Sequence, residues 1–281
     1  MTHLTSTEVL QTIHKLPSLP AVVLELLASM DQEDVNVETL GEKITLDQAL
    51  TAKSLRLANS SFYGMVQQVT TPRQAISILG FRTIRSLVTT SALIGTAPHS
   101  THAEFDAKVF WRHGIAAAAC AREVASNLGG NAEYAYTAAL LHDIGRLILV
   151  TQFPSQFDAI TAHLTRHHGA TLEAEQAVLG LDHAAVGHLL TQHWKFPPAL
   201  QQAVACHHAA PRPREDVLTT AVRIANVLAH GLEETLDDRD AALSPDVLTI
   251  GAELGLEGSP WIAAVDRIKQ SFAGASLVLS T

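Results

Sequence analysis

The sequence predicts an all-α protein, and three observations lead to that fold class. Ala and Leu are abundant, while aromatic residues make up only 5% of the 281 residues, a composition that favours packed helices over sheets. Nearly every segment repeats its apolar residues with the 3.6-residue period of a helix, and strict alternation never lasts beyond a few residues. The 16 Gly and 11 Pro residues are few for a β protein that depends on turns.

Short helices are expected in the N-terminal part of the chain. The first begins with the capping-box pattern Thr5-x-x-Glu8, whose side chains satisfy free backbone amides at a helix start. The rigid turn LPSLP then starts a helix at Pro20 that runs to Met30. Further helices are expected near residues 36–44, 47–58 (with Asp47 as the N-cap), 72–79 and 81–94.

A turn with the sequence ANSSFYG (58–64) interrupts this part of the chain. Leu55 and Leu57 precede it on a helix and are expected to anchor the lobe in its core. Asn59 is expected to bond to nearby backbone rather than to a ligand, because short amide side chains stabilise turns in this way.

A second series of longer helices follows a linker, TAPHSTHA (96–103), and Gly-Gly or Pro-rich stretches separate its members. These helices are expected near residues 104–128, 131–150, 151–167, 170–179, 182–195, 197–208 and 215–230. Two short helices near 244–254 and 259–272 complete the chain. The expected units are an N-terminal helical lobe (1–97), a second helical lobe (98–232) and a C-terminal helical tail (233–281).

Charge and cysteine content narrow the partners and the environment. The formal net charge of −9 argues against nucleic acid or an anionic membrane surface as the main partner. Cys120 and Cys206 lie in Ala-rich helical context and are expected to be buried thiols of a reducing cytosol. No signal peptide is visible, and the longest uncharged stretch, Ser86–Ala103, is too polar to cross a membrane. A cytoplasmic location is therefore expected.

The chain contains 15 histidines, and helical-wheel positions sort them by face. In the helix 182–195, His183 shares the apolar stripe of Val186 and Leu190, whereas His188 falls on the opposite, solvated side. His183 is therefore expected to point inward.

Other helices also carry histidines on an apolar face. His113 continues the stripe that begins at Val109. His207 lies seven residues after Leu200 on the apolar stripe of its helix, and His208 flanks it. Each of them alone would be more simply interpreted as a core residue bonded to a carbonyl group.

Asp143, a carboxylate in an apolar segment, indicates that the inward histidines form a metal site. It lies beside His142 in the most apolar stretch of the chain, ALLHDIGRLILV (139–150), within the single helix expected over 131–150. A carboxylate buried there must be paired or bound to a cation. Imidazole together with carboxylate is the ligand set of Fe, Mn, Zn or Ni rather than of Ca or Mg. The expected metal ligands, on four separate helices, are His113, His142, Asp143, His183, His207 and His208.

The remaining histidines and the usual short catalytic motifs give no competing site. His163 and His167 lie four residues apart on a polar helix and are expected at the surface. Cys206 and His207 diverge by 100° on a helix, which argues against a Cys–His nucleophile. No HExxH, CxxC, P-loop or GxSxG motif is present. No role is assigned to the histidines near termini, helix ends or the linker, which are His3, His14, His99, His102 and His230.

These motifs resemble a known family. HDIGRL (142–147), with the inward histidines before and after it, resembles the HD superfamily of metal-dependent phosphohydrolases. LPSLPAVVLELL (16–27), ITLDQALTAKSLRLANSSFYG (44–64) and TTPRQAISILGFRTIRSLV (70–88) resemble the HDOD domain, the HD-related output domain of bacterial signalling proteins. The resemblance runs from about residue 10 to about residue 232.

The resemblance implies a two-lobed, all-α domain that regulates bacterial signalling through protein partners in the cytosol and lacks the full catalytic set. No receiver, kinase or cyclase domain is visible in this sequence, so a stand-alone member is expected. Two departures from HD phosphodiesterases support a loss of catalysis. His208 is followed by AAPRP (209–213) rather than an acid and a GYP loop, and Asn226 stands where the relatives supply a last aspartate.

Two functions therefore remain open at the level of sequence. The first is a regulatory interaction module that keeps a metal site without catalysis. The second is a metal-dependent phosphohydrolase acting on a nucleotide or cyclic dinucleotide, and a redox or sensing role for bound iron is a third, weaker hypothesis. Because Asp143 is the one carboxylate in the expected ligand set and Asn226 is neutral, two divalent ions would leave uncompensated charge. The sequence predicts one, or at most two, metal ions per chain.

Overall fold

Helices are the only regular secondary structure in the part of the chain that the computed structural model describes, which comprises residues 3–19, 24, 44–45, 48–59, 68–212, 215–237 and 242–280. The predicted all-α class is confirmed. Within these residues, no helix combines the length and the apolar character that are needed to cross a membrane. Outside them lie nearly all of the helices expected near 20–30 and 36–44, together with Asp47 and the side chain of Leu57.

The described N-terminal helices are α1 (Ser6–Ile13), α4 (Gln48–Ala58), α5 (Pro72–Leu79) and α6 (Phe81–Thr96). The expected capping box of Thr5 and Glu8 is present at the start of α1. Asn59 donates to Leu55 O and Val69 O and accepts from Val69 N, with distances of 2.7–2.8 Å. The predicted role of Asn59 is thus confirmed, because its side chain ties the end of α4 to the backbone before α5.

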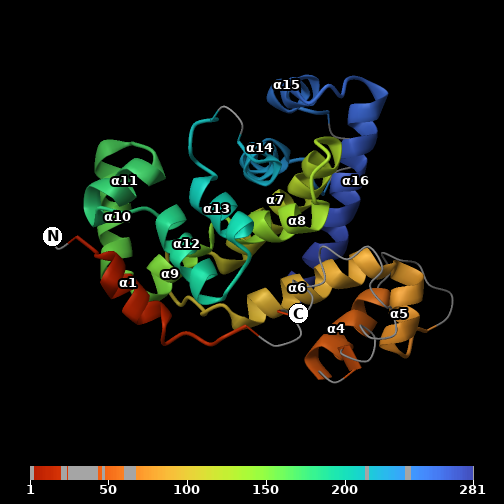
Figure 1. Ribbon diagram of the computed structural model, residues 1–281, viewed down its shortest axis with the longest axis horizontal. Coiled ribbons are helices and arrows are strands. Elements are labelled where there is room, and N and C mark those ends of the chain that lie inside the picture. The colour runs from red at the N-terminus through yellow and green to blue at the C-terminus, as the bar shows by residue number, and fades with distance from the viewer. Residues whose placement is uncertain are drawn as a thin grey trace.

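Helix α1 lies away from the other N-terminal helices (Figure 1). It packs against α12 (His183–His193) of the second series of helices. The amide of Leu4 donates to Leu179 O at 2.9 Å, and the Trp194 indole donates to Pro17 O at 3.2 Å. The first residues of the chain are therefore attached to the second series of helices.

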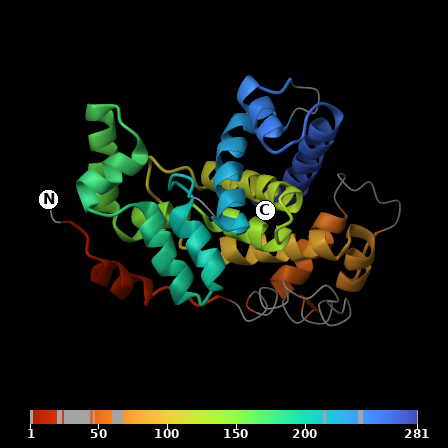
Figure 2. The ribbon, with the colours of Figure 1, turned by 45° about the horizontal axis from the view of Figure 1, so that its top comes forward.

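The second series begins with a long central helix and continues through seven shorter ones (Figures 1 and 2). They are α7 (Ala107–Asn127), α8 (Ala132–Leu141), α9 (Ile144–Gln152), α10 (Pro154–His167), α11 (Thr171–Leu179), α12, α13 (Pro198–Cys206) and α14 (Val217–Leu232). The C-terminal tail contains α15 (Pro245–Glu253), α16 (Ser259–Ser276) and the 3₁₀ helix η1 (Leu277–Ser280).

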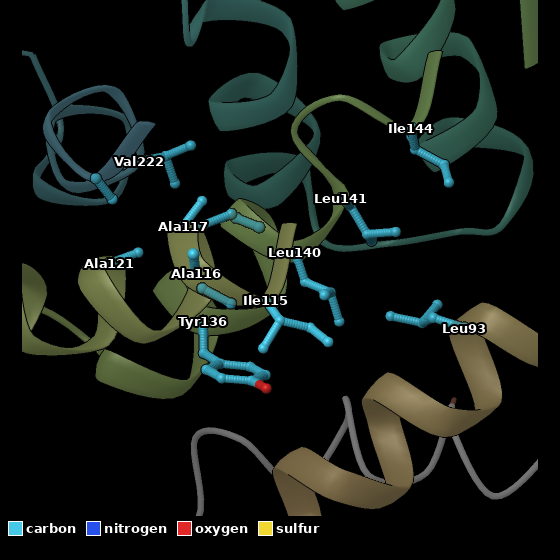
Figure 3. Close-up of a cluster of buried hydrophobic side chains, with 14 of the residues drawn as sticks. Leu93, Ile115, Ala116, Ala117, Ala121, Tyr136, Leu140, Leu141, Ile144 and Val222 are labelled. Atoms are coloured by element: carbon cyan, nitrogen blue, oxygen red, sulfur yellow. The ribbon is translucent and has the colours of Figure 1, made fainter. Parts of the chain in front are cut away.

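Helix α7 is the centre of the core and packs against α8, α14 and α16. Its run of alanines at 116–119 is buried, so neighbouring helices approach it closely. In Figure 3, Ile115 of α7, Leu140 of α8 and Leu93 of α6 meet in one apolar cluster. Truncating a fully buried Leu or Ile of this kind to Ala costs about 2–5 kcal/mol. The core therefore fixes the helices on which the inward histidines stand.

One glycine sets the distance between α9 and α12. A Cβ added to Gly145 would lie 1.9 Å from His183 O and 2.8 Å from Gly187 N. These atoms belong to the backbone of α12, which cannot move aside as a flexible side chain would. A residue without a side chain at position 145 is therefore required for α9 to bring Asp143 against His183.

The prediction of a single helix over 131–150 is wrong, because the helix is interrupted at His142 and Asp143, between α8 and α9. The residues on both sides of the break are apolar, so the hydrophobic pattern of the sequence does not reveal it. Adjacent residues of a continuous helix point about 100° apart, whereas the break lets both side chains face one space. Similarly, α13 ends at Cys206, so His207 and His208 follow the helix instead of completing it.

Four expected burials also differ from the structure. His163, expected at the surface, is half-buried on α10. Val109 is 60% exposed, because it lies in the first turn of α7, where the wheel gives a direction but not a covering neighbour. His188 is half-buried rather than solvated, and its Nδ1 lies 3.2 Å from Gln201 O on the adjacent α13. Cys120 is buried as expected, but Cys206 is only half-buried at the end of its helix.

Candidate metal centre

The six expected ligands come from turns and helix ends as well as from helix faces. His142 and Asp143 occupy the break between α8 and α9, and His183 is the first residue of α12. His207 and His208 follow α13, and His113 lies on α7. All are buried except His208, which is exposed at the rim.

Asp143 is the point at which the histidines meet. Its Oδ1 lies 3.2 Å from His183 Nε2, 3.4 Å from His207 Nε2 and 3.6 Å from His142 Nε2. Its Oδ2 accepts from Arg146 Nη1 at 3.2 Å. One carboxylate oxygen thus faces three imidazoles, and the other faces the rim.

The opposite nitrogen of each of these three rings contacts an oxygen. His142 Nδ1 lies 2.6 Å from Ala139 O, and His207 Nδ1 lies 2.7 Å from Val204 O. His183 Nδ1 lies 2.6 Å from Glu175 Oε2. Because a carbonyl or carboxylate oxygen only accepts, each Nδ1 carries the proton, and in the neutral ring Nε2 presents its lone pair. Metal-ligating histidines are oriented by second contacts of this kind.

The Nε2 atoms converge on one another without enough donors to satisfy them. His183 Nε2 lies 3.4 Å from His207 Nε2 and 3.1 Å from His208 Nε2. His142 Nε2 is buried and has no hydrogen-bond partner. Facing lone pairs need a proton or a cation between them. The donor set, which is three or four imidazole nitrogens with a carboxylate oxygen, fits a divalent transition metal.

Two groups of ligand atoms are compact enough to share an ion, each with all atoms within 4.8 Å of one another. One contains Asp143, His183, His207 and His208, and the other contains His113, His142 and Asp143. Asp143 belongs to both groups. All six expected residues are therefore brought together.

His113 stands at the edge of this cluster, and its two ring nitrogens contact residues of α14 and of its C-cap. Its Nε2 lies 3.1 Å from Asn226 Oδ1, and its Nδ1 lies 2.8 Å from Glu233 Oε1. The ring stacks on His230 with centroids 4.3 Å apart. His113, His230 and Glu233 form a third group of potential ligands. Asn226 thus lies beside a candidate ligand, where the sequence placed it.

The structure reveals three residues of the site that the sequence reasoning missed. His230 and Glu233 follow Asn226 at i+4 and i+7, and Glu233, the C-cap of α14, keeps helical backbone angles, so the three lie on one face. Glu175 is buried beside Leu179 on the apolar side of α11. The argument that selected Asp143, a carboxylate on an apolar face, would also have selected Glu175.

Burial and contacts set the protonation of the metal-free cluster. Burial alone raises the pKa of Asp143, but the surrounding histidines outweigh it and hold that pKa well below the usual range. Burial alone lowers the pKa of His183, but hydrogen bonds to Asp143 and Glu175 raise it to about 9. Burial lowers the pKa of His142 to about 3 and, together with neighbouring histidines, that of His208 to about 4. Without metal, the cluster therefore carries a proton on His183.

The fold is all-α, and it brings five histidines and one aspartate together in one cluster. The sequence matches the HDOD domain over residues 16–210. This chain belongs to the HDOD domain family.

Solved structures with related sequences share the fold. A Shewanella amazonensis protein named "Putative phosphohydrolase" is 30% identical, with a TM-score of 0.71, and the alignment covers 96% of this chain and 97% of that one. An HDOD domain protein of unknown function from Geobacter sulfurreducens is 21% identical, with a TM-score of 0.72 and 98% of each chain covered. The second comparison, at this identity, concerns the fold alone.

A curated relative is longer than this chain. An uncharacterized protein of Treponema pallidum is 25% identical over 225 residues, which is 79% of this chain and 43% of that protein. The matched region therefore spans less than half the length of that relative.

Proposed function

We propose that this HDOD protein is a regulatory module of the bacterial cytosol that acts through protein partners and holds a divalent transition metal at its His/Asp cluster, without hydrolysing a phosphodiester. The single observation that supports the proposed metal site is that three imidazole Nε2 atoms converge on Asp143 Oδ1. Each of these rings is oriented by an oxygen atom that contacts its Nδ1. A bound ion would supply Lewis-acid charge and would link the helices that carry its ligands.

Asp143, His183, His207 and His208 are the set that would hold a first ion, because they offer four ligand atoms. His113 and His142, which share Asp143, would hold a second ion less tightly. We propose Fe, Mn, Zn or Ni as the metal.

Two contacts support the absence of hydrolysis. The neutral amide of Asn226, rather than a carboxylate, faces His113 Nε2. Arg146, the nearby cation that would hold a substrate phosphate, pairs with Asp143 instead.

Elemental analysis of protein purified without chelators tests the metal. We expect about one equivalent of a transition metal in the natural protein and a loss of most of it in His207→Ala. His163→Ala, a half-buried histidine on α10, is the matched control and should keep the metal. If the natural protein contains no metal, and Mn, Fe and Zn leave its melting temperature unchanged, the metal site is refuted.

Cross-linking in the host cell tests the partner. We expect the natural chain to be joined reproducibly to the same signalling proteins, and His207→Ala to be joined to them more weakly. The absence of any protein cross-linked above the background of an unrelated chain would contradict the interaction module.

A metal-dependent phosphohydrolase is the second candidate function. It is favoured by the two ligand groups that share Asp143 and by the name of the 30% identical Shewanella relative. Bis(p-nitrophenyl) phosphate and a cyclic dinucleotide are the test substrates, each with and without a chelator. Hydrolysis that both the chelator and His142→Ala abolish would establish the enzyme in place of the non-catalytic module.

A further inference from the structure

A cavity of about 690 Å³ lies between α6, α7 and α16, away from the histidines. Figures 1 and 2 show α16 lying beside α7, and α6 also packs against α16. None of the residues of the His/Asp cluster lines the cavity. Its volume is within the range of about 300–1,000 Å³ that is typical of small-molecule sites.

Positive charge is concentrated around this cavity. Arg82, Arg122 and Arg267 line it, and Glu123 is the one carboxylate among its lining residues. Behind this wall, Arg85 Nη2 lies 3.0 Å from Glu133 Oε2, and Arg122 Nη2 contacts the same oxygen at 3.2 Å. Three of these four arginines pair with the two carboxylates Glu123 and Glu133. Together the six groups carry a local charge of about +2 in a chain with a net charge of −9.

Arg122 is held in place by contacts from three other helices. Its guanidinium lies 4.1 Å above the Tyr136 ring of α8 and also contacts Glu133 there. It donates to Ser86 of α6 and to Ser271 of α16 at 3.2 Å. An arginine fixed in this way has already lost the side-chain entropy that binding would otherwise cost.

The two other arginines lie at the mouth of the cavity. Arg82 and Arg267 are exposed, and Arg267 is paired with Glu123. Hydroxyl and amide groups of Thr83, Ser126 and Gln270 are also among the lining groups, with Leu87 and Ala119 as an apolar wall. Guanidinium groups recognise phosphate by paired hydrogen bonds, and hydroxyl and amide groups suit a hydroxylated organic body.

We propose that this cavity binds a small phosphate-bearing metabolite, between a sugar phosphate and a nucleotide in size, through Arg82, Arg122 and Arg267. The ligand contacts all three helices and therefore joins the N-terminal lobe, the central helix and the C-terminal tail. Binding at this cavity does not depend on the metal proposed for the histidine cluster.

Isothermal titration with ribose 5-phosphate, a nucleoside monophosphate and inorganic phosphate tests the proposal. We expect at least one of the two organic phosphates to bind more tightly than inorganic phosphate. Arg82→Gln and Arg267→Gln should each weaken that binding by about tenfold or more, since a charge-assisted hydrogen bond contributes about 1.5–3 kcal/mol. Arg166→Gln, at an exposed position on α10, should leave it unchanged.

Glu123→Gln gives a result of the opposite sign. It removes the carboxylate that competes with the ligand for Arg267, so we expect binding to become tighter. His207→Ala should bind the same organic phosphate as the natural chain does, which separates this test from that of the metal centre. The proposal is overturned if citrate or sulfate binds as tightly as the organic phosphates, if the Arg82 and Arg267 variants bind normally, or if neither organic phosphate binds.

Discussion

Two buried polar clusters lie against helix α7, one around Arg122 and one around Asp143, and they differ in the charges of the atoms that face each other. Around Arg122, cations face a carboxylate and hydroxyl groups, so the contacts are attractive within the protein itself. Around Asp143, ring nitrogens with lone pairs face each other and a carboxylate oxygen. The facing charges of the first cluster are of opposite sign and hold it together without a bound ion, whereas the second needs a cation or a proton. Burial of polar groups alone therefore does not indicate a metal site. A metal site is indicated when the buried atoms that face one another are all hydrogen-bond acceptors, so that a cation is needed between them.

Gly145→Ala should produce the largest effect on the Asp143 cluster. The new Cβ would overlap the backbone of α12 at His183 O, so α9 and α12 must separate and the core must open. We expect the free energy of unfolding to fall by about 3 kcal/mol or more, since overpacking against immobile atoms is costly. Denaturant unfolding measures it.

Gly95→Ala is the matched control on an exposed helical position of α6. An added Cβ there meets nothing within 4 Å. It should be neutral or stabilising by up to about 1 kcal/mol, because Ala favours helix more than Gly does. Equal losses in the two variants would show that the close approach of α9 to α12 is not required.

Glu175→Gln should weaken metal binding without changing a ligand. Glu175 accepts from both the backbone amide and Nδ1 of His183, at 2.9 and 2.6 Å. Loss of such an outer carboxylate typically costs about 10–100-fold in metal affinity. Competition with a chromogenic chelator measures the change. Glu173→Gln, on the exposed side of the same helix, should retain natural affinity; a similar loss there would assign the effect to the net charge of α11.

The pKa of His183 predicts how the metal-free protein responds to pH. Its folded value of about 9 lies above the ordinary 6.5, so the stability it contributes is present in full below pH 6.5. That contribution is lost as pH rises from 6.5 through 9, by about 1–3 kcal/mol in total. Unfolding in the presence of a chelator should show this decline.

His183→Gln should remove most of the decline between pH 6.5 and 9. In the natural protein, metal affinity should rise over the same range, because the metal must displace the proton of His183. Metal affinity that is constant from pH 6.5 to 9 would contradict the protonation assigned to His183.

The comparison of the two clusters also shows what a sequence can reveal. Helical periodicity predicted most helices, and the apolar surroundings of His142 and Asp143 predicted a buried site. The break between α8 and α9 was not predictable in this way, because its flanks are equally apolar. Glu175 was missed although its position on an apolar face was readable. The contact of Glu233 with His113 depends on where α14 ends against α7, which is a property of the tertiary structure.

Asn226→Asp should have the smallest effect on stability and the most informative effect on metal content. Two divalent ions bring four positive charges, and Asp143 is the one carboxylate among the six expected ligands. Glu175 and Glu233 add negative charge behind the rings of His183 and His113, whose Nδ1 atoms they contact. The charge count made from the sequence did not include these two carboxylates. An aspartate at 226 would place a further charge beside His113 Nε2, next to the group formed by His113, His142 and Asp143.

We therefore expect the metal content of Asn226→Asp, measured by elemental analysis, to rise from about one ion per chain toward two. We also expect this variant to gain weak hydrolysis of a generic phosphodiester. Gln192→Glu, which adds the same charge on the exposed side of α12, should stay at the natural stoichiometry. If the natural protein already holds two ions and hydrolyses a phosphodiester in a chelator-sensitive way, Glu175 and Glu233 supply the charge that Asn226 lacks. The cluster is then a catalytic centre, and the non-catalytic module is wrong.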